Sequence, residues 1–241
     1  MKKIIIYGGT SFLSIEFIKK FSNEVDEFTV ISRNKKKFEE KILINGKTLK
    51  LKIKSYQIDL LDLENNLKFC KELENNTYDG IFFVMGETGD PELEINNFEK
   101  CYENYKINLI HPVLIINSLL PKLKKNSYIC VFTSLAGIRG RALRLFYCSA
   151  KAGLISYLSG LRQKLQSSNI NVINVVAGYM NTEKFNYKAN KLLISNPKEV
   201  IDRVYKGIKN KKETIYSSLI WLFISIIIKF IPERIFKKLK F

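Results

Sequence analysis

Short apolar runs alternate along the chain with segments in which apolar residues recur at helical spacing. Ile4–Tyr7 is a continuous apolar run, typical of a strand that is buried on both faces, and Ile15–Phe21 behind it has the spacing of a helix with one apolar side. Further strands are predicted at Phe28–Ile31, Tyr56–Ile58, Gly80–Met85, Tyr128–Phe132, Val172–Val176 and Glu213–Tyr216. Repeated strand–helix units of this length predict an α/β fold, a doubly wound parallel sheet with helices on both faces.

Helical spacing fills most of the segments between these strands. Helices are predicted over Leu63–Leu73, Phe98–Leu120, Phe146–Leu165 and Pro197–Lys209, the last with Ser195 or Asn196 as its N-cap. Asn45-Gly46 lies between the apolar runs Ile42–Ile44 and Leu49–Ile53, and this pattern predicts a small edge hairpin. No internal repeat or linker divides this part of the chain, so residues 1–216 are expected to form one domain.

The stretch 217–241 differs in character from the rest. Thr214 to Ile228 is fifteen residues without a charge, and Lys229 and the basic segment 234–240 follow it. The apolar run is shorter than the roughly 20 residues that a membrane-spanning helix needs. An apolar segment beside a basic amphipathic one favours an anchor at a membrane interface. A single span, or packing on the domain or in a dimer interface, are the alternatives.

The composition is that of a packed globular protein with a large positive excess. The chain is 46% hydrophobic, and 40 Lys+Arg against 23 Asp+Glu give a net charge of +17. This charge favours an anionic partner, such as a phosphorylated cofactor or substrate or an acidic lipid, or else it lies on solvated faces. No nucleic-acid-binding motif accompanies it, so nucleic acid is not an expected partner. Four scattered cysteines and one histidine do not provide the close-set ligands of a metal site. The apolar run near the N-terminus is too short for a secretory segment, so the expected location is the cytosol.

The turn after the first strand, YGGTSFLS, has the arrangement that binds a pyrophosphate. A strand, two glycines and a helix N-terminus would point backbone N–H groups at the phosphates. Gly8 and Gly9 permit the tight turn, and Thr10 or Ser11 would cap the helix or bind phosphate. The later glycines of the usual fingerprint are missing, and Phe12 would have to turn its ring away from the cofactor.

The second strand ends in VISRN, which bears on the choice of cofactor. Sites selective for NAD usually carry a carboxylate here that holds the ribose 2′-hydroxyl. This chain has Ser32 and Arg33 instead, and a guanidinium suits a 2′-phosphate with no acid standing by to repel it. The sequence therefore favours NADP(H) over NAD(H), with a solvated Arg33 as the alternative.

The most specific pattern is a serine, a tyrosine and a lysine. Ser134 ends a strand, Tyr147 follows thirteen residues later, and Lys151 lies four residues further on. The two last residues share one face of a helix. An ammonium beside a phenol is expected to lower the phenol's pKa, and a hydroxyl at the strand end would hold a carbonyl oxygen. The three side chains would together protonate an oxygen while hydride reaches the adjoining carbon.

At these residues the chain resembles the short-chain dehydrogenase/reductase family, which has a Rossmann-like fold. The residues that carry the resemblance are GGTS at 8–11, Asp59, Asn108, Ser134, YCSAK at 147–151 and AGYMNT at 177–182. The resemblance implies that Tyr147 is the general acid/base and that Ser134 orients the substrate. It also implies that Lys151 binds the nicotinamide ribose and that Asn108 supports a water-linked proton path to Lys151.

The same resemblance implies further cofactor contacts. Asp59 would contact the adenine, and Thr182 would contact the carboxamide region of the nicotinamide. Gly86 is the one residue kept from the family's Asn-Ala-Gly after the fourth strand, and Gly178 is kept from the Pro-Gly after the sixth. The family usually forms dimers or tetramers through its two long helices, so a homo-oligomer is expected.

A narrower likeness concerns the segment SLAGIRGRALRLFYCSAKAG and the basic C-terminus. Both resemble decaprenylphosphoryl-2-keto-ribose reductases and related reductases of sugar and capsule pathways. That likeness implies a keto-sugar substrate, free or lipid-linked, in polysaccharide or cell-envelope biosynthesis. Arg139, Arg141 and Arg144 lie just before Tyr147 and would grip a phosphate, or else serve loop packing or a subunit contact.

These observations predict an NADPH-dependent reductase of a ketone, peripheral on the inner face of the cytoplasmic membrane. The alternatives are a soluble reductase of 3-oxoacyl groups or small ketones, and a cofactor-binding protein that has lost catalysis. The complete serine–tyrosine–lysine set argues against the last alternative.

Overall fold

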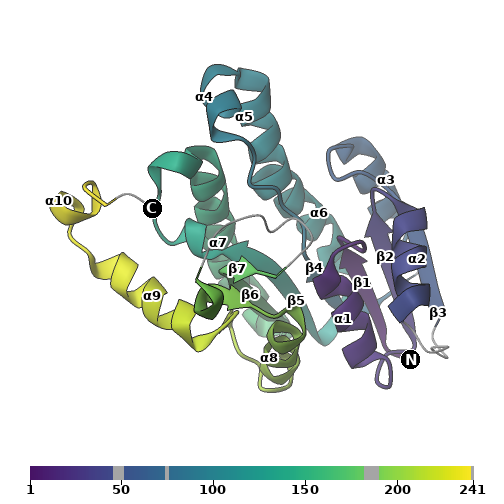
Figure 1. The fold of residues 1–241 in the computed structure, drawn as a ribbon. Coiled ribbons are helices and arrows are strands. Elements are labelled where there is room, and N and C mark those ends of the chain that lie inside the picture. Colours follow the sequence, from purple (N-terminus) through teal and green to yellow (C-terminus); the bar gives the residue numbers. More distant parts are fainter. Residues whose placement is uncertain (46–51, 74–75, 182–189, 240–241) are drawn as a thin grey trace.

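The computed structural model describes residues 1–45, 52–73, 76–181 and 190–239. Its centre is a seven-stranded parallel sheet with the strand order β3-β2-β1-β4-β5-β6-β9, which confirms the predicted fold (Figure 1). The strands are β1 (Lys3–Tyr7), β2 (Glu27–Ser32), β3 (Lys52–Gln57), β4 (Tyr78–Phe83), β5 (Leu123–Ser134), β6 (Asn171–Ala177) and β9 (Thr214–Tyr216). A second, two-stranded sheet joins β7 (Tyr179–Met180) to β8 (Ile194–Ser195).

Helices cover both faces of the large sheet. They are α1 (Phe12–Phe21), α2 (Lys35–Asn45), α3 (Leu63–Glu72), α4 (Pro91–Asn96), α5 (Phe98–Tyr105), α6 (His111–Leu119), α7 (Leu145–Leu165), α8 (Pro197–Lys209), α9 (Leu219–Phe230) and α10 (Glu233–Phe236). Successive residues of β1 point to opposite faces, so Ile4 and Ile6 pack with α1 and α8 while Ile5 and Tyr7 pack with α3, α6 and α7. The central strands β1, β4 and β6 are mostly buried because both faces of the sheet are covered there, whereas the edge strand β3 is polar and largely exposed.

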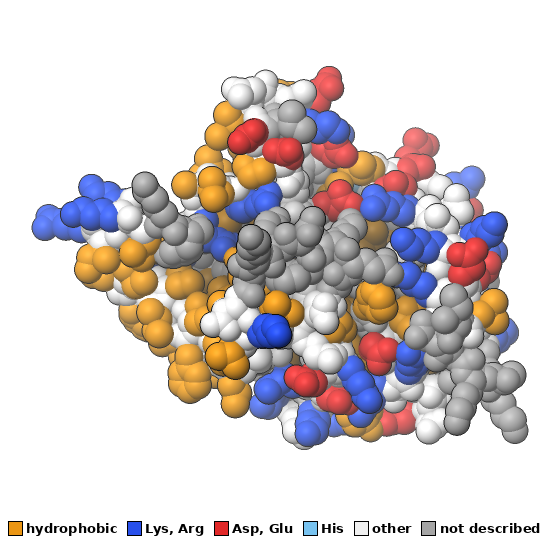
Figure 2. Space-filling view, viewed as in Figure 1, with side chains coloured by type: hydrophobic (Ala, Val, Ile, Leu, Met, Phe, Trp, Pro, Cys, Tyr) orange, Lys and Arg blue, Asp and Glu red, His pale blue; other side chains and the backbone are white. Residues whose placement is uncertain are grey.

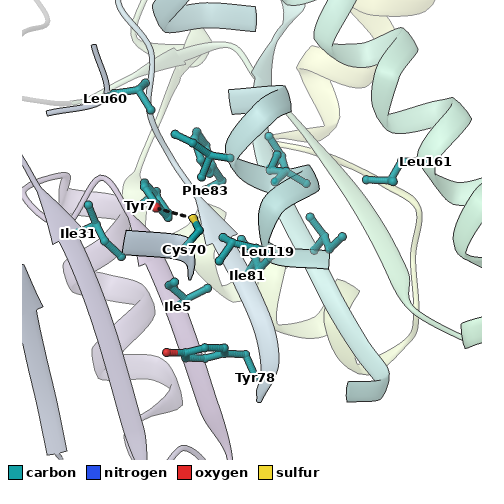
Figure 3. Packing of buried hydrophobic residues seen from close by; sticks show 14 of the residues in the cluster. Ile5, Tyr7, Ile31, Leu60, Cys70, Tyr78, Ile81, Phe83, Leu119 and Leu161 are labelled. Carbon is teal, nitrogen blue, oxygen red and sulfur yellow. Dashed lines mark hydrogen bonds between the residues drawn. The ribbon is translucent and has the colours of Figure 1, made fainter. Parts of the chain in front are cut away.

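The core on the α3 side is closed by aromatic and aliphatic side chains from several elements (Figure 3). The Tyr7 ring stacks on Phe83 with the ring centroids 5.1 Å apart, and its hydroxyl lies 3.8 Å from the Cys70 sulfur. These contacts lock β1 to β4 and to α3. They fix the carboxyl ends of the two central strands, where the order of the sheet reverses and α/β folds place their ligands.

Two predicted elements differ from those observed. The helix expected over Phe98–Leu120 is divided into α5 and α6 by a π-helical turn at Lys106–Ile110. The hairpin expected around Asn45-Gly46 is wrong on its N-terminal side, where α2 runs to Asn45. Phe38 is buried and Ile42 packs against the same core, which is a helical i, i+4 spacing. The short apolar run was compatible with both structures.

The C-terminal segment is helical and lies against the domain. Ser218 caps α9, and the helix turns Trp221 and Ser225 inward, where they are buried. Its outward face is apolar and exposed, at Leu219, Ile220, Phe223, Ile226, Ile227 and Phe230. Figure 2 shows these hydrophobic side chains gathered along α9, with Lys and Arg side chains beyond them over α10. In the described part of the chain, no helix combines the length and the apolar character needed to cross a membrane.

Candidate active site

The glycine turn after β1 is built so that only glycine fits. Gly8 has a φ of +95°, and a Cβ at this position would lie 2.4 Å from the Val84 carbonyl oxygen. A Cβ on Gly9 would lie 2.4 Å from a methyl carbon of Val30. The backbone N–H groups of both glycines point to the Ile31 carbonyl oxygen at 3.0 Å. The turn is therefore pressed between the ends of β2 and β4.

The residues that replace the later glycines also have defined positions. Ser11 is the N-cap of α1, and Ser14 donates a hydrogen bond to the Gly8 carbonyl oxygen at 2.8 Å. The Phe12 ring lies under the Lys41 ammonium, 4.4 Å from it, and Lys41 also donates to the Thr10 carbonyl oxygen at 3.2 Å. Phe12 thus packs toward α2. Ser14 stabilises the turn in place of a glycine.

Three polar side chains from β5 and α7 meet at the carboxyl edge of the sheet. Ser134 ends β5, and its Oγ accepts a hydrogen bond from the Ala136 N–H at 3.1 Å. Tyr147 and Lys151 lie one turn apart on α7, with the Lys151 Nζ 5.7 Å from the centroid of the Tyr147 ring. Ser134 and Tyr147 both line one cavity. The structure therefore brings together the three residues that the sequence singles out.

Burial is the main influence on both titratable groups of this trio. Desolvation raises the pKa of Tyr147, although the hydrogen bond with Ser134 and the charges of Arg141 and Arg144 act to lower it. Desolvation lowers the pKa of Lys151 to about 8. The sequence predicts a lowered pKa for Tyr147, and the structure corrects this because burial outweighs the nearby positive charges. The phenol holds its proton at neutral pH, and the amine is mostly charged below pH 8.

Asn108 reaches this site from the π-helical turn. It is fully buried, and its Nδ2 donates to the Glu87 carbonyl oxygen at 2.8 Å while its Oδ1 accepts from the Glu87 N–H at 3.3 Å. Gly86 has a φ of +154°, and a Cβ there would lie 2.7 Å from the Lys151 Nζ and 2.8 Å from the Asn108 Oδ1. Lys151 and Asn108 therefore approach the same small space above Gly86, where a side chain would separate them. A single π turn often occurs at functional sites.

A cavity of about 770 Å³ opens beside these residues. Its lining combines the polar residues Ser134 and Tyr147 with Arg141 and Arg144, and the remaining walls come from the loop after β4, the segment after β6, and Trp221 of α9. Gly178 also lines the cavity, and it packs so closely on Trp221 that a Cβ there would lie 2.0 Å from the indole ring. The volume suits a small-molecule ligand.

The positions of the three predicted substrate arginines differ. Arg141 and Arg144 line the cavity, and Arg144 donates to the Gly89 carbonyl oxygen at 2.7 Å. Arg139 lies instead against the C-terminal segment. It donates to the Ile228 carbonyl oxygen at 2.9 Å and pairs with the Glu233 carboxylate at 2.6 Å. Its guanidinium is thus used to hold the end of α9, which corresponds to the loop-packing alternative.

The predicted adenosine-binding residues lie at the ends of β2 and β3. The Arg33 guanidinium lies 3.1 Å from a carboxylate oxygen of Glu87, both side chains being partly exposed. The sequence suggests that no acid stands near Arg33, and Glu87 corrects this because the ends of β2 and β4 both adjoin β1. The Ser32 hydroxyl is buried and has no hydrogen-bond partner among the described residues. Asp59 is exposed, with its carboxylate accepting from the Leu61 N–H at 3.0 Å, and Thr182 lies outside the described residues.

Sequence reasoning missed Trp221 as a residue of the site. Its indole N–H donates to the Leu193 carbonyl oxygen at 3.0 Å, and its ring meets Tyr179 edge to face with the centroids 5.5 Å apart. The sequence predicts that residues 217–241 are an appendage outside the domain, whereas Trp221 of this segment lines the cavity. The one available signal is that the tryptophan interrupts an otherwise aliphatic run.

Comparisons with known proteins agree with this geometry. The family model described as short chain dehydrogenase matches residues 2–192. The ketoacyl reductase HetN of Nostoc sp. is 35% identical over 114 residues, which are 44% of this chain and 40% of that protein. Estradiol 17-beta-dehydrogenase 11 of Macaca fascicularis is 24% identical over 80% of this chain and 75% of its own length. The chain thus spans less than half of the HetN relative.

Solved structures share the fold. A short-chain dehydrogenase from Streptomyces avermitilis has a TM-score of 0.79 at 14% identity, covering 94% of this chain and 92% of that one. A short-chain dehydrogenase/reductase from Burkholderia multivorans with bound NADP has a TM-score of 0.72 at 16% identity, covering 89% and 95%. The family match extends over most of the sheet and over all three residues of the trio. The chain therefore belongs to the short-chain dehydrogenase family, oxidoreductases that interconvert C=O and CH–OH groups.

Proposed function

We propose that the chain is an NADPH-dependent reductase that converts a ketone to an alcohol, on a sugar or lipid-linked sugar, at the inner surface of the cytoplasmic membrane. The observation that carries this proposal is the meeting of Ser134, Tyr147 and Lys151 beside one cavity, with Asn108 behind them. The geometry serves carbonyl reduction because a proton donor and a hydrogen-bonding hydroxyl face the same space.

Each polar group has a separate task in this scheme. Ser134 would hold the carbonyl oxygen, and Tyr147 would donate its proton to that oxygen, which its raised pKa keeps available at neutral pH. Lys151 is buried and charged below pH 8, and its ammonium would stabilise the phenolate that remains. When bound, the nicotinamide would supply the hydride.

The residues present fit a dinucleotide. The glycine turn leaves no room for side chains near the N-terminus of α1, where Thr10 and Ser11 would face a pyrophosphate. Ser32 offers a buried hydroxyl without a described partner at the end of β2, and Arg33 would bind a 2′-phosphate. The ion pair between Arg33 and Glu87 is partly exposed and weak, so a phosphate would displace the carboxylate.

Turnover with the two cofactors tests the activity and its cofactor together. The probes are ethyl acetoacetate and ribulose 5-phosphate, each with NADPH or NADH, followed by absorbance of the reduced cofactor. We expect NADPH to be favoured by about tenfold in kcat/KM, and Arg33→Ala to remove that preference while leaving kcat/KM for NADH within about twofold, because one charge-assisted contact is lost. Lys35→Ala is the matched control. Equal use of both cofactors by the unaltered protein would contradict the NADPH assignment.

The substrate class rests on the cavity and its surroundings. Arg141 and Arg144 on the cavity wall suit a phosphate beside the reacting carbonyl, which a phosphorylated sugar would provide. The exposed apolar face of α9 adjoins the same wall through Trp221 and suits contact with a bilayer. Lys229 and Arg234 then lie where acidic lipid headgroups would be.

The second candidate is reduction of a 3-oxoacyl group. The observation in its favour is similarity to HetN, named a ketoacyl reductase, and to a 3-oxoacyl-[acyl-carrier-protein] reductase of Rickettsia felis, 27% identical over 65% of this chain and 66% of that protein. Rapid turnover of ethyl acetoacetate and none of ribulose 5-phosphate would favour this candidate.

Membrane contact is tested by charges placed on the outward face of α9. The double variant Phe223→Glu, Ile227→Glu leaves Trp221 in the cavity wall, whereas removal of residues 217–241 would damage the site itself. We expect its partition onto phosphatidylglycerol vesicles to fall about tenfold in co-sedimentation, since carboxylates resist burial among lipids. Leu43→Glu, on an exposed position of α2, is the control and should bind like the parent. Unchanged binding, or a change of oligomeric state instead, would assign this face to something other than lipid.

An oligomer remains an expectation of the same proposal. The exposed side chains Phe98 and Tyr102 stack on each other along α5, and Leu145 is exposed at the start of α7. These positions lie on the long helices through which we propose that two copies pair.

A further inference from the structure

A chain of buried hydrogen bonds runs from α4 to Asn108. Glu94, Asn104 and Asn108 are 4%, 5% and 0% exposed. The Asn104 Nδ2 donates to the Glu94 carboxylate at 2.6 Å, and the Asn108 Nδ2 donates to the Asn104 Oδ1 at 2.9 Å. Among the described residues Glu94 forms no salt bridge, which is unusual for a carboxylate in a protein core, and neither the cofactor turn nor the trio uses it. This series of hydrogen bonds ends at Asn108, which stands beside Lys151.

The Glu94 carboxylate fixes which way each amide in this series of hydrogen bonds is turned. A carboxylate accepts hydrogen bonds, so the Asn104 amide must turn its N–H toward Glu94 and its oxygen toward Asn108. The Asn108 Nδ2 then meets three oxygens, the Asn104 Oδ1, the Asn104 carbonyl at 3.0 Å and the Glu87 carbonyl at 2.8 Å. Its own oxygen is thereby directed to the opposite side, toward the Glu87 N–H and the space above Gly86 that Lys151 shares.

The loop after β4 closes over the same carboxylate. Gly89 has a φ of +70°, and a Cβ there would lie 1.6 Å from a Glu94 oxygen. The Glu94 N–H donates to the Asp90 carbonyl at 2.9 Å, and Arg144 donates to the Gly89 carbonyl at 2.7 Å. Glu94, on α4, thus lies against Gly89 of the cavity wall, and Glu87 of the same loop bonds to Asn108, so the positions of Glu94 and Asn108 are linked through this loop.

We propose that Glu94 is a positioning residue for reduction, which fixes the Asn108 amide so that its oxygen faces Lys151. This inference rests on the proposed roles of Tyr147 and Lys151. The substrate and the cofactor do not touch Glu94 in this scheme. Its contribution passes through Asn104, and the group it controls is an acceptor for the Lys151 ammonium or for water bound to it.

The test compares variants at position 94. Glu94→Leu removes the acceptor, while Glu94→Gln keeps an oxygen that can accept from Asn104. We expect kcat with ethyl acetoacetate and NADPH to fall about tenfold for Glu94→Leu, with KM for NADPH within about twofold, and to stay within about threefold for Glu94→Gln. Glu92→Leu makes the same change at an exposed position of α4 and should leave kcat unaltered. Equal kcat for Glu94→Leu and the parent would overturn the proposal, and so would parallel losses of kcat and NADPH affinity, which indicate general loosening.

Two additions keep the test decisive. Asn104→Asp conserves volume but sets two acceptors against each other, so it should reproduce the loss of kcat if Glu94→Leu fails to fold. A readout without any ketone is hydrogen exchange of the Asn108 side-chain amide, by ¹⁵N NMR of the NADPH complex. We expect exchange about tenfold faster in Glu94→Leu, and unchanged exchange would overturn the proposal. A parent protein that binds NADPH but reduces no ketone would refute the proposed function. The exchange measurement would still show whether Glu94 fixes the Asn108 amide.

Discussion

Replacing Tyr147 by phenylalanine is expected to lower kcat for ketone reduction by about a thousandfold, within the range known for loss of a general acid. Tyr147 lines the cavity beside Ser134, and its hydroxyl is the proton donor that we propose, whereas Phe keeps the ring and its packing on α7. Among the described residues, Tyr147 and Ser134 line the cavity and Lys151 does not; its Nζ lies 5.7 Å from the centroid of the Tyr147 ring, so the ammonium is not placed to replace the phenol as a donor to the carbonyl oxygen. Turnover is followed by oxidation of NADPH with the two probe ketones.

Cofactor binding is the accompanying measurement. Trp221 is the sole tryptophan and lines the cavity, so quenching of its emission reports NADPH binding. We expect Kd for NADPH to change by less than about twofold in Tyr147→Phe. Tyr157→Phe is the control, because this tyrosine lies on the same helix and its buried hydroxyl has no described hydrogen-bond partner. Turnover that survives in Tyr147→Phe would refute the assignment, and NADPH binding without turnover in the parent would indicate an idle cofactor-binding protein.

Gly86→Ala is expected to reduce kcat by about a hundredfold. The new Cβ would lie 2.7 Å from the Lys151 Nζ and 2.8 Å from the Asn108 oxygen, at a φ of +154° that L side chains rarely adopt. Backbone strain of this kind costs of order 1–3 kcal/mol, and displacement of the ammonium adds a loss in the transition state. The measurement is kcat together with the thermal midpoint of unfolding.

A matched glycine on α7 separates these effects. Gly160 is exposed and a Cβ there meets nothing within 4 Å, so Gly160→Ala should raise stability by about 0.5–1 kcal/mol without changing kcat. A Gly86→Ala protein with normal turnover would mean that Lys151 tolerates displacement, contrary to the role proposed for it.

The sheet and the trio were predictable from the sequence because each depends on local spacing. Continuous apolar runs such as Ile4–Tyr7 mark strands buried on both faces, and Tyr147 and Lys151 meet through the pitch of a single helix. Asn196 as the cap of α8 follows from the same kind of local rule, and the structure confirms it. Local patterns of this kind do not depend on how distant segments pack.

The remaining features depend on contacts between distant segments. Arg139 is drawn to α9 by carbonyl groups 89 and 92 residues away, and Glu87 meets Arg33 because β1 holds the ends of β2 and β4 together. The π turn at Lys106–Ile110 adds a residue to a helix whose apolar pattern continues through it, although Pro112 follows two residues later. A hydrophobic pattern alone could not reveal these contacts.

The place of α9 has an energetic consequence for a lipid substrate. One side of this helix forms the cavity wall through Trp221, and its other side is the apolar face that we propose meets the bilayer. A helix with its side chains is about 10 Å across. Drawing an alkyl tail wholly into water costs about 0.8 kcal/mol for each methylene. If the carbonyl headgroup is reduced only one helix width from the bilayer, most of its alkyl tail can stay among the acyl chains. The free energy needed to bring the headgroup into the cavity should then depend little on the length of the tail.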